Sequence, residues 1–402
     1  MYQKFRNNPY ICRVIVCKMR KIVVAFDSFK GSLSSYEASE AFVAGVKDVD
    51  SEVECCAVAI ADGGEGMAEA IVGSVGGRMV TASVHDPLGR TIIASYGLIA
   101  NGETAIIPIS SASGLTLLAP EERNPLYATT YGTGELMLDA VKRGCRQIVV
   151  GLGGSATNDG GVGMLRALGY MFLDVEGVEL TATIDILERV TTILPPANSP
   201  FEGVAIRVAV DVDNPLCGNL GASFVFGAQK GADEATIVRL DKALQHYADV
   251  VAKWRGRDVS TAAGMGAAGG AGFAFGAVLD AMPQSGIELI LSTIDFDNII
   301  ADASLVVTGE GCIDCQTIMG KAPAGVLRHA KRAGVRCVAV GGGVKWCDEL
   351  RNSDFDAIYA ATPEGMPLDI AMKKEVATSN LRRIATSIFR DLSLYKSISL
   401  KH

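Results

Sequence analysis

Three kinds of loop in the sequence combine glycine with carboxylate, hydroxyl or lysine side chains, and each follows an apolar run. The first reads DSFKG, from Asp27 to Gly31, and lies between the apolar run 22–26 and a helix-like stretch. Backbone N–H groups at such a strand-to-helix turn, together with a lysine, bind anions well. Ser34 or Ser35 is a good cap for the following helix, but capping does not explain Asp27 or Lys30. We therefore expect this loop to bind an anion.

Two further loops are acidic and rich in glycine. One reads ADGGEG and carries Asp62 and Glu65, and the other reads TGEGCIDCQTIMGK and carries Glu310, Asp314 and Lys321. Both follow strand-like runs, and flexible backbone with convergent carboxylates offers the oxygen ligands that Mg²⁺ prefers. A solvated turn, in which Asp and Gly are common for conformational reasons, is the alternative for each loop.

The third kind of loop is GLGGSATNDGGVGMLRALG, residues 151–169, which has the G-x-G-x-x-A spacing of a dinucleotide fingerprint. Asp174 lies about 20 residues on, where that fingerprint places an acidic residue. A dinucleotide-binding fold begins its helix at the glycines, however, whereas the NDGG at 158–161 breaks a helix. We therefore expect the helix to begin near Gly161, after a long loop whose N–H groups and hydroxyls bind an anion.

Two other polar loops lack a simple structural explanation. Ser110 and Ser111 open SSASG after a strand-like run, and Lys230 lies in FGAQKG downstream of the turn DVDNPL. Ordinary turn chemistry explains the Asn-Pro and Gly residues equally well. The sequence has no G-x-x-x-x-G-K-[ST] and no G-x-S-x-G, which excludes a P-loop NTPase and argues against an α/β-hydrolase. A second G-x-G-x-x-G match at 264–269 has no strand before it and indicates helix packing.

The composition is that of an ordinary globular protein with no general attraction for polyanions. The 402 residues are 49% hydrophobic and 20% charged, with a formal net charge of −8 and a pI near 5.2. This balance argues against nucleic acid and anionic membranes as partners. No apolar run has the length of a membrane span or a signal peptide core, so we expect a cytoplasmic protein. The ten cysteines show no framework spacing, and we expect reduced thiols, with the CxxC of Cys312 and Cys315 incidental.

Apolar, β-branched runs alternate with helix-like stretches at both ends of the chain and predict βα units with a parallel sheet. The expected strands are 22–26, 53–59, 305–307, 337–340 and 357–360, and the expected helices are 36–46, 67–72, 287–300, 324–333 and 370–392. The middle of the chain predicts antiparallel strands at 79–84, 90–99 and 103–109 and helices at 134–143, 162–168, 233–253 and 268–279.

We therefore predict an α/β protein with two domains. Residues 19–62 and 287–392 form a discontinuous, doubly wound domain with a parallel sheet, and residues 63–286 form an inserted mixed α/β domain. We expect residues 1–18 to be an N-terminal extension, because Met19 directly before the first apolar run is a more natural start. Ligands are expected in the cleft between the domains, where strand ends and loops converge.

In this order the loops resemble those of the bacterial glycerate kinase family, from Met19 to about Leu392. The resemblance rests on ten motifs: AFDSFKGSLSS, ADGGEG, DPLGR, SSASGL, YGTGEL, GLGGSATNDGG, DVDNPL, FGAQKGA, GMGAAGG and TGEGCIDCQTIMGK. It implies ATP-dependent phosphorylation of D-glycerate with Mg²⁺. It also implies two α/β domains, of which the discontinuous one is flavodoxin-like (Rossmann-type).

The sequence departs from the family pattern at three positions. Cys312 stands where the family usually has Arg, Met67 where it has Thr, and Ala228 where it has Pro. The first change matters most, because a guanidinium can bind a phosphate or carboxylate through two parallel hydrogen bonds and a thiol cannot. We expect Lys321 or Arg90 to supply the missing charge.

Phosphoryl transfer requires positioning, charge neutralisation and a proton acceptor, and on the resemblance we assign these roles to the loops. The residues expected at the ATP phosphates are Gly153, Gly154, Ser155, Thr157 and Lys230. The residues expected to bind D-glycerate are Asp27, Ser28, Arg90, Ser110 and Ser111. The residues expected to hold Mg²⁺ are Asp62, Glu65 and Glu310. Asp314 is the expected catalytic base, with Lys30 and Lys321 as the other catalytic residues.

Other functions fit parts of the pattern. An NAD(P)-dependent oxidoreductase would use the loop at Gly151 and Asp174, and a non-catalytic two-domain protein would bind a small anion in its cleft. GHMP kinases share the letters GLG, but their glycines open a long helix. The resemblance favours 2-phosphoglycerate over 3-phosphoglycerate as the product. D-Glycerate is the expected partner, without nucleic acid or membrane, and a homodimer is left open.

Overall fold

The computed structural model describes residues 21–60, 64 and 66–399, with side-chain burial given as far as residue 390. The expected N-terminal extension, residues 1–18, and the predicted metal ligands Asp62 and Glu65 therefore lie outside the described residues. The chain divides into two compact units, one of residues 1–61 with 291–402 and the other of residues 62–290. No helix in the described part of the chain is long and apolar enough to span a membrane.

The first unit contains a five-stranded sheet in the order β13-β12-β11-β1-β2, and every neighbouring pair is parallel. Numbered along the chain this order is 2-1-3-4-5, the flavodoxin-like arrangement. The strands are β1 (Lys21–Phe26), β2 (Glu54–Ala59), β11 (Leu305–Ile313), β12 (Cys337–Val344) and β13 (Ala357–Ala360). Strand order reverses between β1 and β11, so the carboxyl ends of these two strands form the switch point at which such sheets bind ligands.

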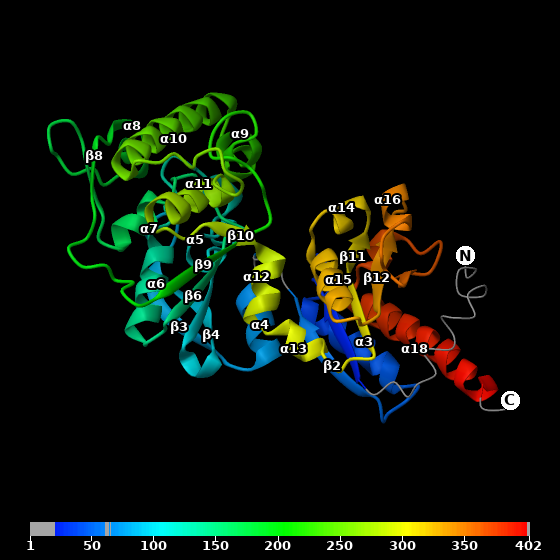
Figure 1. Ribbon diagram of the computed structural model, residues 1–402. Helices are drawn as coiled ribbons and strands as arrows, with labels where there is room; N and C mark the ends of the chain where they lie inside the picture. The colour runs from blue at the N-terminus through cyan, green and yellow to red at the C-terminus, as the bar shows by residue number, and fades with distance from the viewer. Residues whose placement is uncertain (1–20, 61–63, 65, 400–402) are drawn as a thin grey trace. The chain divides into compact units, whose positions relative to one another are not determined.

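Helices cover both faces of this sheet (Figure 1). On one face α3 (Ser35–Lys47) packs against α18 (Lys374–Ser399) over a core that includes Phe26, Phe42 and Leu381. The serine at 34 is the N-cap of α3 and forms a capping box with Glu37. On the other face α15 (Ala322–Arg332) contacts β11 and β12. The shorter helices of this unit are α13 (Phe296–Ile300), α14 (Cys315–Ile318), α16 (Asp348–Arg351) and α17 (Leu368–Ala371).

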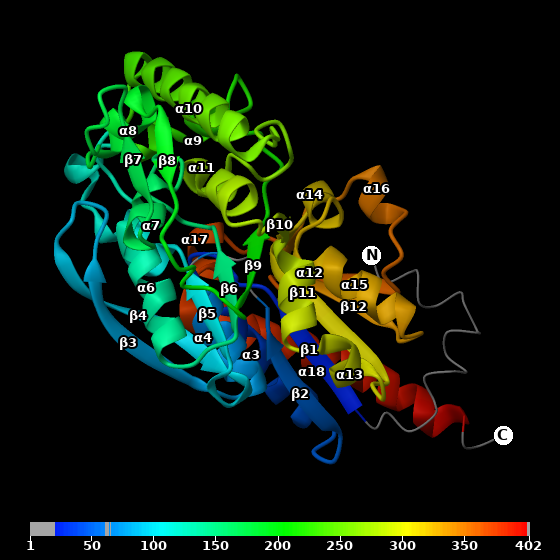
Figure 2. The same ribbon diagram turned by 60° about the vertical axis from the view of Figure 1, so that its left-hand side comes forward.

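The second unit contains a six-stranded mixed sheet in the order β10-β9-β6-β5-β4-β3 (Figure 2). The pairs β3–β4 and β4–β5 are antiparallel, as the short turns of the sequence predict, and the remaining pairs are parallel. The strands are β3 (Arg78–His85), β4 (Thr91–Ile99), β5 (Thr104–Pro108), β6 (Gln147–Gly151), β9 (Ala205–Val210) and β10 (Pro283–Ser285). A separate antiparallel pair joins β7 (Met171–Leu173) to β8 (Thr192–Leu194).

The helices of the second unit pack on the mixed sheet and on one another. Contacts join α4 to β4 and β5, α6 to β3 and β5, α6 to α7, and α10 to α8. The helices are α4 (Met67–Val75), α5 (Ser110–Ser113), α6 (Tyr131–Lys142), α7 (Val162–Ala167), α8 (Thr183–Arg189), α9 (Ala222–Phe226), α10 (Glu234–Arg255) and α11 (Ala267–Phe273). Helix α12 (Gly286–Thr293) carries the chain across the boundary between the units. The two-unit α/β fold with a flavodoxin-like sheet is the fold class that the sequence predicted.

Three predicted helices are wrong in detail. The stretch 287–300 forms two helices, because Asp295 adopts a left-handed conformation with φ of 54°. The stretch 370–392 likewise divides between α17 and α18. Within 268–279, residues 268–270 have positive φ, and a π-helical turn follows at Ala274–Val278. Helical periodicity is retained across such breaks, so it does not reveal them.

The prediction that the cysteines are all reduced is also wrong. Cys315 and Cys347 form a disulfide with a Cα–Cα separation of 6.1 Å, which lies within the range that a disulfide can bridge. The two residues are 32 positions apart in the sequence. Cys312, the other member of the CxxC, keeps a free thiol.

Candidate active site

The carboxyl ends of β1 and β11 bring Asp27 and Glu310 to the same edge of the parallel sheet. In the strand register Phe26 pairs with Gly309, so the next residues along the two strands are Asp27 and Glu310. The backbone N–H of Asp27 donates to the carbonyl of Gly309 at 2.9 Å, and both carboxylate residues are at least nine-tenths buried. Parallel pairing thus places two carboxylates at the switch point of the sheet.

Thr317 connects Glu310 to Asp314. Its hydroxyl donates to Glu310 Oε1 at 2.7 Å and accepts the backbone N–H of Asp314 at 2.9 Å. Asp314 is the N-cap of α14, and its carboxylate accepts the N–H of Gln316 at 2.9 Å. Because Thr317 is fully buried, this hydroxyl fixes the geometry of the loop that carries both acidic residues.

Two lysines place positive charge beside these carboxylates. Lys321 Nζ lies 3.7 Å from Glu310 Oε2 and 4.0 Å from Asp314 Oδ1. Burial raises the pKa of Glu310 above its ordinary value, and the Thr317 hydroxyl and the ammonium groups of Lys321 and Lys30 partly offset that rise. We call Asp27, Lys30, Glu310, Asp314 and Lys321 the switch-point cluster. All five come from two predicted loops, and the fold brings these loops together.

The donor chemistry of the switch-point cluster fits a hard divalent cation. Glu310 and Asp314 supply carboxylate oxygens, and Mg²⁺ in proteins is commonly held by one or two carboxylates together with waters and substrate phosphates. A cation at Glu310 would also compensate the burial of that carboxylate. The sequence places Glu310 in a loop, whereas the structure places it within β11, where it pairs with Gly341 of β12.

The second candidate region is the loop that follows β6. This glycine loop, residues 152–161, ends where α7 begins at Val162, with Gly161 as its N-cap. The predicted helix start near Gly161 is therefore confirmed. Gly153 is half-buried and Gly154 is exposed, and no hydrogen-bond acceptor for their N–H groups is found among the described residues. These two amides are free to bind an anion.

Asp174 does not serve the dinucleotide interpretation. It follows β7, which belongs to the separate antiparallel pair and not to the main sheet. Its carboxylate accepts the N–H groups of Glu176 and Val178 at 2.9 and 3.0 Å and pairs with Arg189 at 2.8 Å. These contacts with the turn and with Arg189 stabilise the local structure. The spacing that suggested a fingerprint is therefore a coincidence.

The serines of α5 lie against the glycine loop. The carbonyl of Gly154 accepts the N–H of Leu115 at 2.9 Å, and the N–H of Ala156 donates to the carbonyl of Ser113 at 2.9 Å. A Cβ atom added at Gly154 would lie 3.4 Å from the Ser110 side chain. Ser110 is nearly buried and Ser111 is half-buried. The predicted Ser110 and Gly154 sites therefore belong to one surface.

Lys230 supports the glycine loop from below and does not face solvent. Its Nζ donates to Ser155 Oγ at 3.1 Å and to the Thr157 carbonyl at 2.6 Å, and the residue is 2% exposed. Burial lowers the pKa of Lys230 from 10.5 to about 8, and the Asp159 carboxylate partly opposes that fall. Thr157 is also fully buried, and its hydroxyl has no hydrogen-bond partner among the described residues.

Asp159 is a structural anchor of the glycine loop that the sequence analysis treated only as a helix breaker. Its Oδ2 accepts the N–H and hydroxyl of Thr130 at 2.8 and 2.7 Å and the N–H of Gly163 at 3.2 Å, and its Oδ1 accepts the N–H of Gly161 at 3.0 Å. Burial raises the pKa of Asp159, and these donors lower it in part. A Cβ atom at Gly163 would lie 2.0 Å from Thr129 Oγ1, so only glycine fits there.

The GMGAAGG motif packs beneath the same loop. The Gly269 carbonyl accepts the N–H of Gly160 at 2.9 Å. Gly269 has a φ of +66°, and a Cβ atom there would lie 2.0 Å from the Thr157 carbonyl oxygen. This contact explains the motif as a close approach of two backbones rather than a second nucleotide fingerprint.

Arg90 is held by structural partners. Its guanidinium donates to Asp86 Oδ2 at 2.5 Å, to Glu122 Oε1 at 2.7 Å and to the Leu117 carbonyl at 3.4 Å. About half of the side chain is exposed, at 49%. Any contact with a substrate anion would have to share these donors with two carboxylates.

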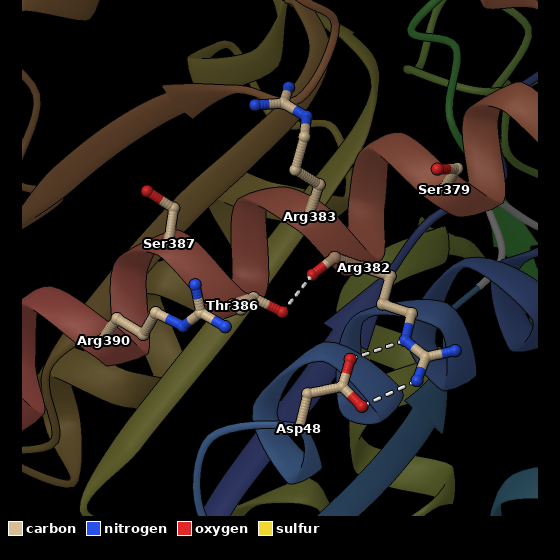
Figure 3. Close-up of a pocket in the computed structure, with 7 residues that line it drawn as sticks. All are labelled: Asp48, Ser379, Arg382, Arg383, Thr386, Ser387 and Arg390. Carbon is tan, nitrogen blue, oxygen red and sulfur yellow. Dashed lines mark hydrogen bonds and ion pairs between the residues drawn. The ribbon is translucent and has the colours of Figure 1, made fainter.

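A pocket of about 440 Å³ lies along α18 in the first unit and contains none of the residues discussed above (Figure 3). Arg382 points its guanidinium at Asp48 with two bonds of 2.6 Å, and Arg383 donates to the Ala361 carbonyl at 2.7 Å. These arginines are therefore engaged within the protein. Its full lining is Asp48, Ser379, Arg382, Arg383, Thr386, Ser387 and Arg390.

Thr317 and Asp159 are the residues at the site that sequence reasoning missed. The signal for Thr317 is local, because Asp314 and Thr317 have the spacing of a capping box. Asp159 has no comparable local signal, since its main partner Thr130 is 29 positions away.

Comparison with known proteins supports one family. The chain matches the glycerate kinase family over residues 22–393. It is 40% identical over 382 residues to a glycerate kinase of Bacillus subtilis (strain 168), covering 94% of this chain and all of the relative. It is 41% identical over 378 residues to a glycerate 2-kinase of Escherichia coli (strain K12), covering 93% of this chain and 98% of the relative. A crystal structure from Salmonella typhimurium LT2, described as that of a candidate glycerate kinase 2, is similar with a TM-score of 0.84 and 39% identity over 94% of this chain and the whole of that chain.

The burial of Lys230 predicts a specific dependence of stability on pH. Between about pH 8 and 10.5 the unfolded chain keeps a proton that folded Lys230 releases, so this group makes the free energy of unfolding rise with pH in that window. We expect wild type to gain up to about 1.4 kcal/mol per pH unit relative to Lys230→Met there, measured by urea unfolding. The exposed Lys253→Met is the matched control, and its curve should stay parallel to wild type. If the curve of unfolding free energy against pH for Lys230→Met is also parallel to that of wild type, burial does not lower the pKa of Lys230.

Proposed function

The chain belongs to the glycerate kinase family and is a kinase, and from that premise we propose that it transfers a phosphoryl group from ATP to D-glycerate with Mg²⁺. The observation that carries the proposal is the switch-point cluster, in which Lys321 lies within 4.0 Å of both Glu310 and Asp314. Phosphoryl transfer requires positioned charge of both signs and a proton acceptor. The cluster contains all three in one connection after a core strand.

Asp314 is our choice for the catalytic base. Its carboxylate is half-exposed at the N-terminus of α14, whereas Glu310 is 9% exposed and accepts the Thr317 hydroxyl. A base that takes a proton from a glycerate hydroxyl has to reach the substrate, which favours the more accessible acid. Lys321, 4.0 Å from that carboxylate, would stabilise charge that develops on the transferred group.

Glu310 is our choice for the principal protein ligand of Mg²⁺, with Asp62 and Glu65 as the other ligands, directly or through water. The ion would neutralise charge on the phosphates of ATP and orient the transferred group. Glu310, whose Oε1 accepts the Thr317 hydroxyl, would hold the ion through its carboxylate. Lys321, 3.7 Å from Glu310 Oε2, would place positive charge near the phosphates.

We assign the ATP phosphates to the glycine loop. The accessible amides of Gly153 and Gly154 would donate directly to phosphate oxygens. Ser155, Thr157 and Lys230 were expected to contact phosphate as well, but they are all at least nine-tenths buried. We therefore propose that they hold the shape and positive potential of the loop from beneath.

We assign D-glycerate to hydroxyl and lysine groups at strand ends. Lys30 and Ser28 follow β1, and Ser110 and Ser111 open α5 after β5. A lysine suits the carboxylate of glycerate and serines suit its hydroxyls. Asp27 would orient the backbone of this loop, since its Oδ1 accepts the N–H of Ser28 at 2.6 Å. Arg90 is a further candidate for this role.

We propose 2-phosphoglycerate as the product, and the name of the glycerate 2-kinase relative supports this choice. The test incubates the protein with Mg·ATP and D-glycerate, follows release of ADP, and identifies the product by phosphorus NMR. We expect one ADP for each molecule of 2-phosphoglycerate. Formation of 3-phosphoglycerate would contradict the proposed position of phosphorylation. The absence of D-glycerate-dependent ADP release would contradict the proposed phosphorylation of D-glycerate by ATP. A parallel fluorescence titration with NADH should show no binding, which would dismiss the oxidoreductase alternative.

Asp314→Asn tests the proposed base without disturbing the fold. Asparagine also caps helices well, so the bond to the Gln316 N–H is kept while the proton acceptor is lost. We expect kcat to fall about 10² to 10⁴-fold, measured by steady-state ADP release at saturating substrates. The control is Asp348→Asn, an exposed acid in the first turn of α16, which should retain wild-type turnover. A near-normal kcat in Asp314→Asn would show that Asp314 is not the catalytic base.

A further inference from the structure

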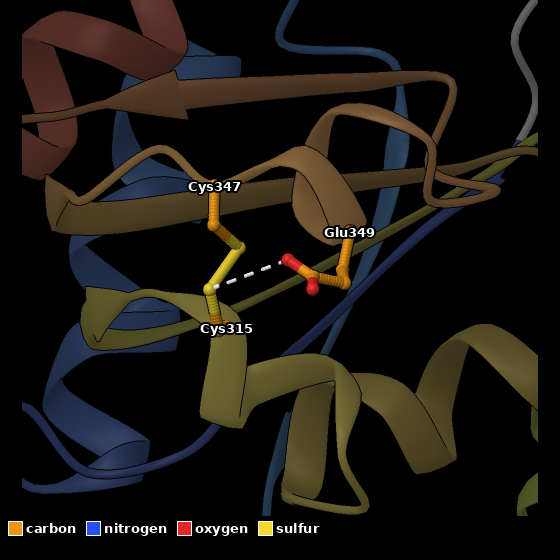
Figure 4. A group of neighbouring side chains, drawn as sticks. All are labelled: Cys315, Cys347 and Glu349. Carbon is orange, nitrogen blue, oxygen red and sulfur yellow. Dashed lines mark hydrogen bonds between the residues drawn. A yellow bond between two sulfur atoms is a disulfide. The ribbon is translucent and has the colours of Figure 1, made fainter.

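A covalent bond joins the loop that carries the switch-point acids to the next βα connection of the same sheet. Cys315 is the first residue of α14, directly after Asp314, and its sulfur is bonded to that of Cys347, the N-cap of α16 (Figure 4). The loop closed by this bond spans 32 positions. The bond therefore fixes the start of α14 relative to β12 and α16.

The position of this bond matters because α14 is a single turn. The same turn contains Thr317, whose hydroxyl holds Glu310, and begins at the cap Asp314. A four-residue helix has little intrinsic stability. The capping hydrogen bonds, the Thr317–Glu310 bond and the disulfide help to hold it in place, together with contacts to α15 and α16.

Both sulfurs are within reach of a reductant. Cys315 and Cys347 are half-exposed, and the residues that follow them, Gln316 and Asp348, are exposed. Cys347 Sγ accepts the N–H of Leu350 at 3.4 Å, an interaction that would favour a thiolate once the bond is cut. An accessible, loop-borne disulfide is of the labile kind rather than the buried structural kind.

The pairing is specific. Cys312, three positions before Cys315, is held in β11 opposite Gly343 of β12 and keeps a free thiol. The CxxC of the sequence is therefore not the redox pair.

We propose that Cys315 and Cys347 form a thiol–disulfide exchange site that controls the order of the loop bearing Asp314 and Thr317. The co-reactant is a dithiol. One thiolate of the dithiol attacks a sulfur of the protein disulfide and forms a mixed disulfide with it. The other cysteine of the protein leaves as a thiolate and takes up a proton. The second thiol of the reductant then displaces the mixed disulfide, leaving two protein thiols and an oxidised dithiol. The effect on activity rests on the proposed function.

The oxidised protein holds α14 in the observed arrangement, and the reduced protein lets it move. A misplacement of about 1 Å at a reacting centre can cost up to about 10²-fold in rate. We therefore expect kcat of the oxidised protein to exceed that of the reduced protein by about threefold or more. Amide hydrogen exchange of residues 314–321 should also be faster after reduction.

The experiment compares the full chain purified without reductant with the same chain treated with dithiothreitol. Thiols are alkylated and the protein is digested, and mass spectrometry then shows which cysteines are linked. We expect a Cys315–Cys347 cross-linked peptide that disappears on reduction. Hydrogen exchange and ADP release are measured on both states of wild type, Cys347→Ser and Cys312→Ser. Cys312→Ser should keep the wild-type ratio of oxidised to reduced rates, and Cys347→Ser should show a ratio of one.

Recovery of Cys315 and Cys347 as free thiols from the protein treated with oxidised dithiol would overturn the proposal, as would a link from Cys315 to Cys312. If the peptide map confirms the linked and the reduced states and residues 314–321 exchange at the same rate in both, the disulfide does not control the order of the loop. If neither state phosphorylates D-glycerate, the proposed function fails, while the peptide map and the exchange rates still decide the redox site.

Discussion

A buried carboxylate within β11, level with the end of the neighbouring strand β1, is the constraint on which the first unit depends. Glu310 loses solvent at the switch point of the sheet, which raises its pKa, and a charge in such a place must be paired. The Thr317 hydroxyl and the ammonium of Lys321 are the partners that the fold supplies. Both come from the segment that follows β11, so satisfying Glu310 also determines where Asp314 lies. The contacts that stabilise the buried Glu310 are thus the same contacts that set the geometry of the site.

The glycine loop solves a related problem in the second unit. A loop that presents bare N–H groups cannot be stabilised by continuing as a helix, because its amides must stay available. Asp159 and Lys230 replace that support from beneath, since one accepts four donors around the start of α7 and the other binds Ser155 and Thr157. Two buried charged residues, each with polar partners, hold a surface of accessible backbone.

Most of the fold could be predicted because the period of apolar residues is a local signal. The run 22–26 became β1 within one residue, and the NDGG sequence correctly placed the start of α7. Tertiary pairing overrode local composition elsewhere. The glycines of TGEG suggested a loop, yet β11 continues through them to Ile313 because β12 pairs with it.

The candidate site was predictable only where its residues share a loop. Glu310, Asp314 and Lys321 could be grouped from the sequence, whereas the burial of Lys230 could not, because its partners lie 75 and 73 positions away. The partner of Cys315 was equally hidden, since a half-exposed cysteine 32 positions on leaves no local pattern. Asp174 shows the opposite error, in which a familiar spacing was satisfied by a turn.

We propose that Glu310, held by Thr317, is the metal-binding residue of the first unit. Binding of Mn²⁺ to the protein, titrated by electron paramagnetic resonance, tests it without any turnover. We predict an affinity loss of about tenfold or more for Thr317→Val, since outer partners of metal ligands commonly change affinity by about 10 to 100-fold, and a larger loss for Glu310→Gln. Thr317→Ser, which keeps the hydroxyl, should bind like wild type. Unchanged Mn²⁺ affinity in Glu310→Gln would contradict the account.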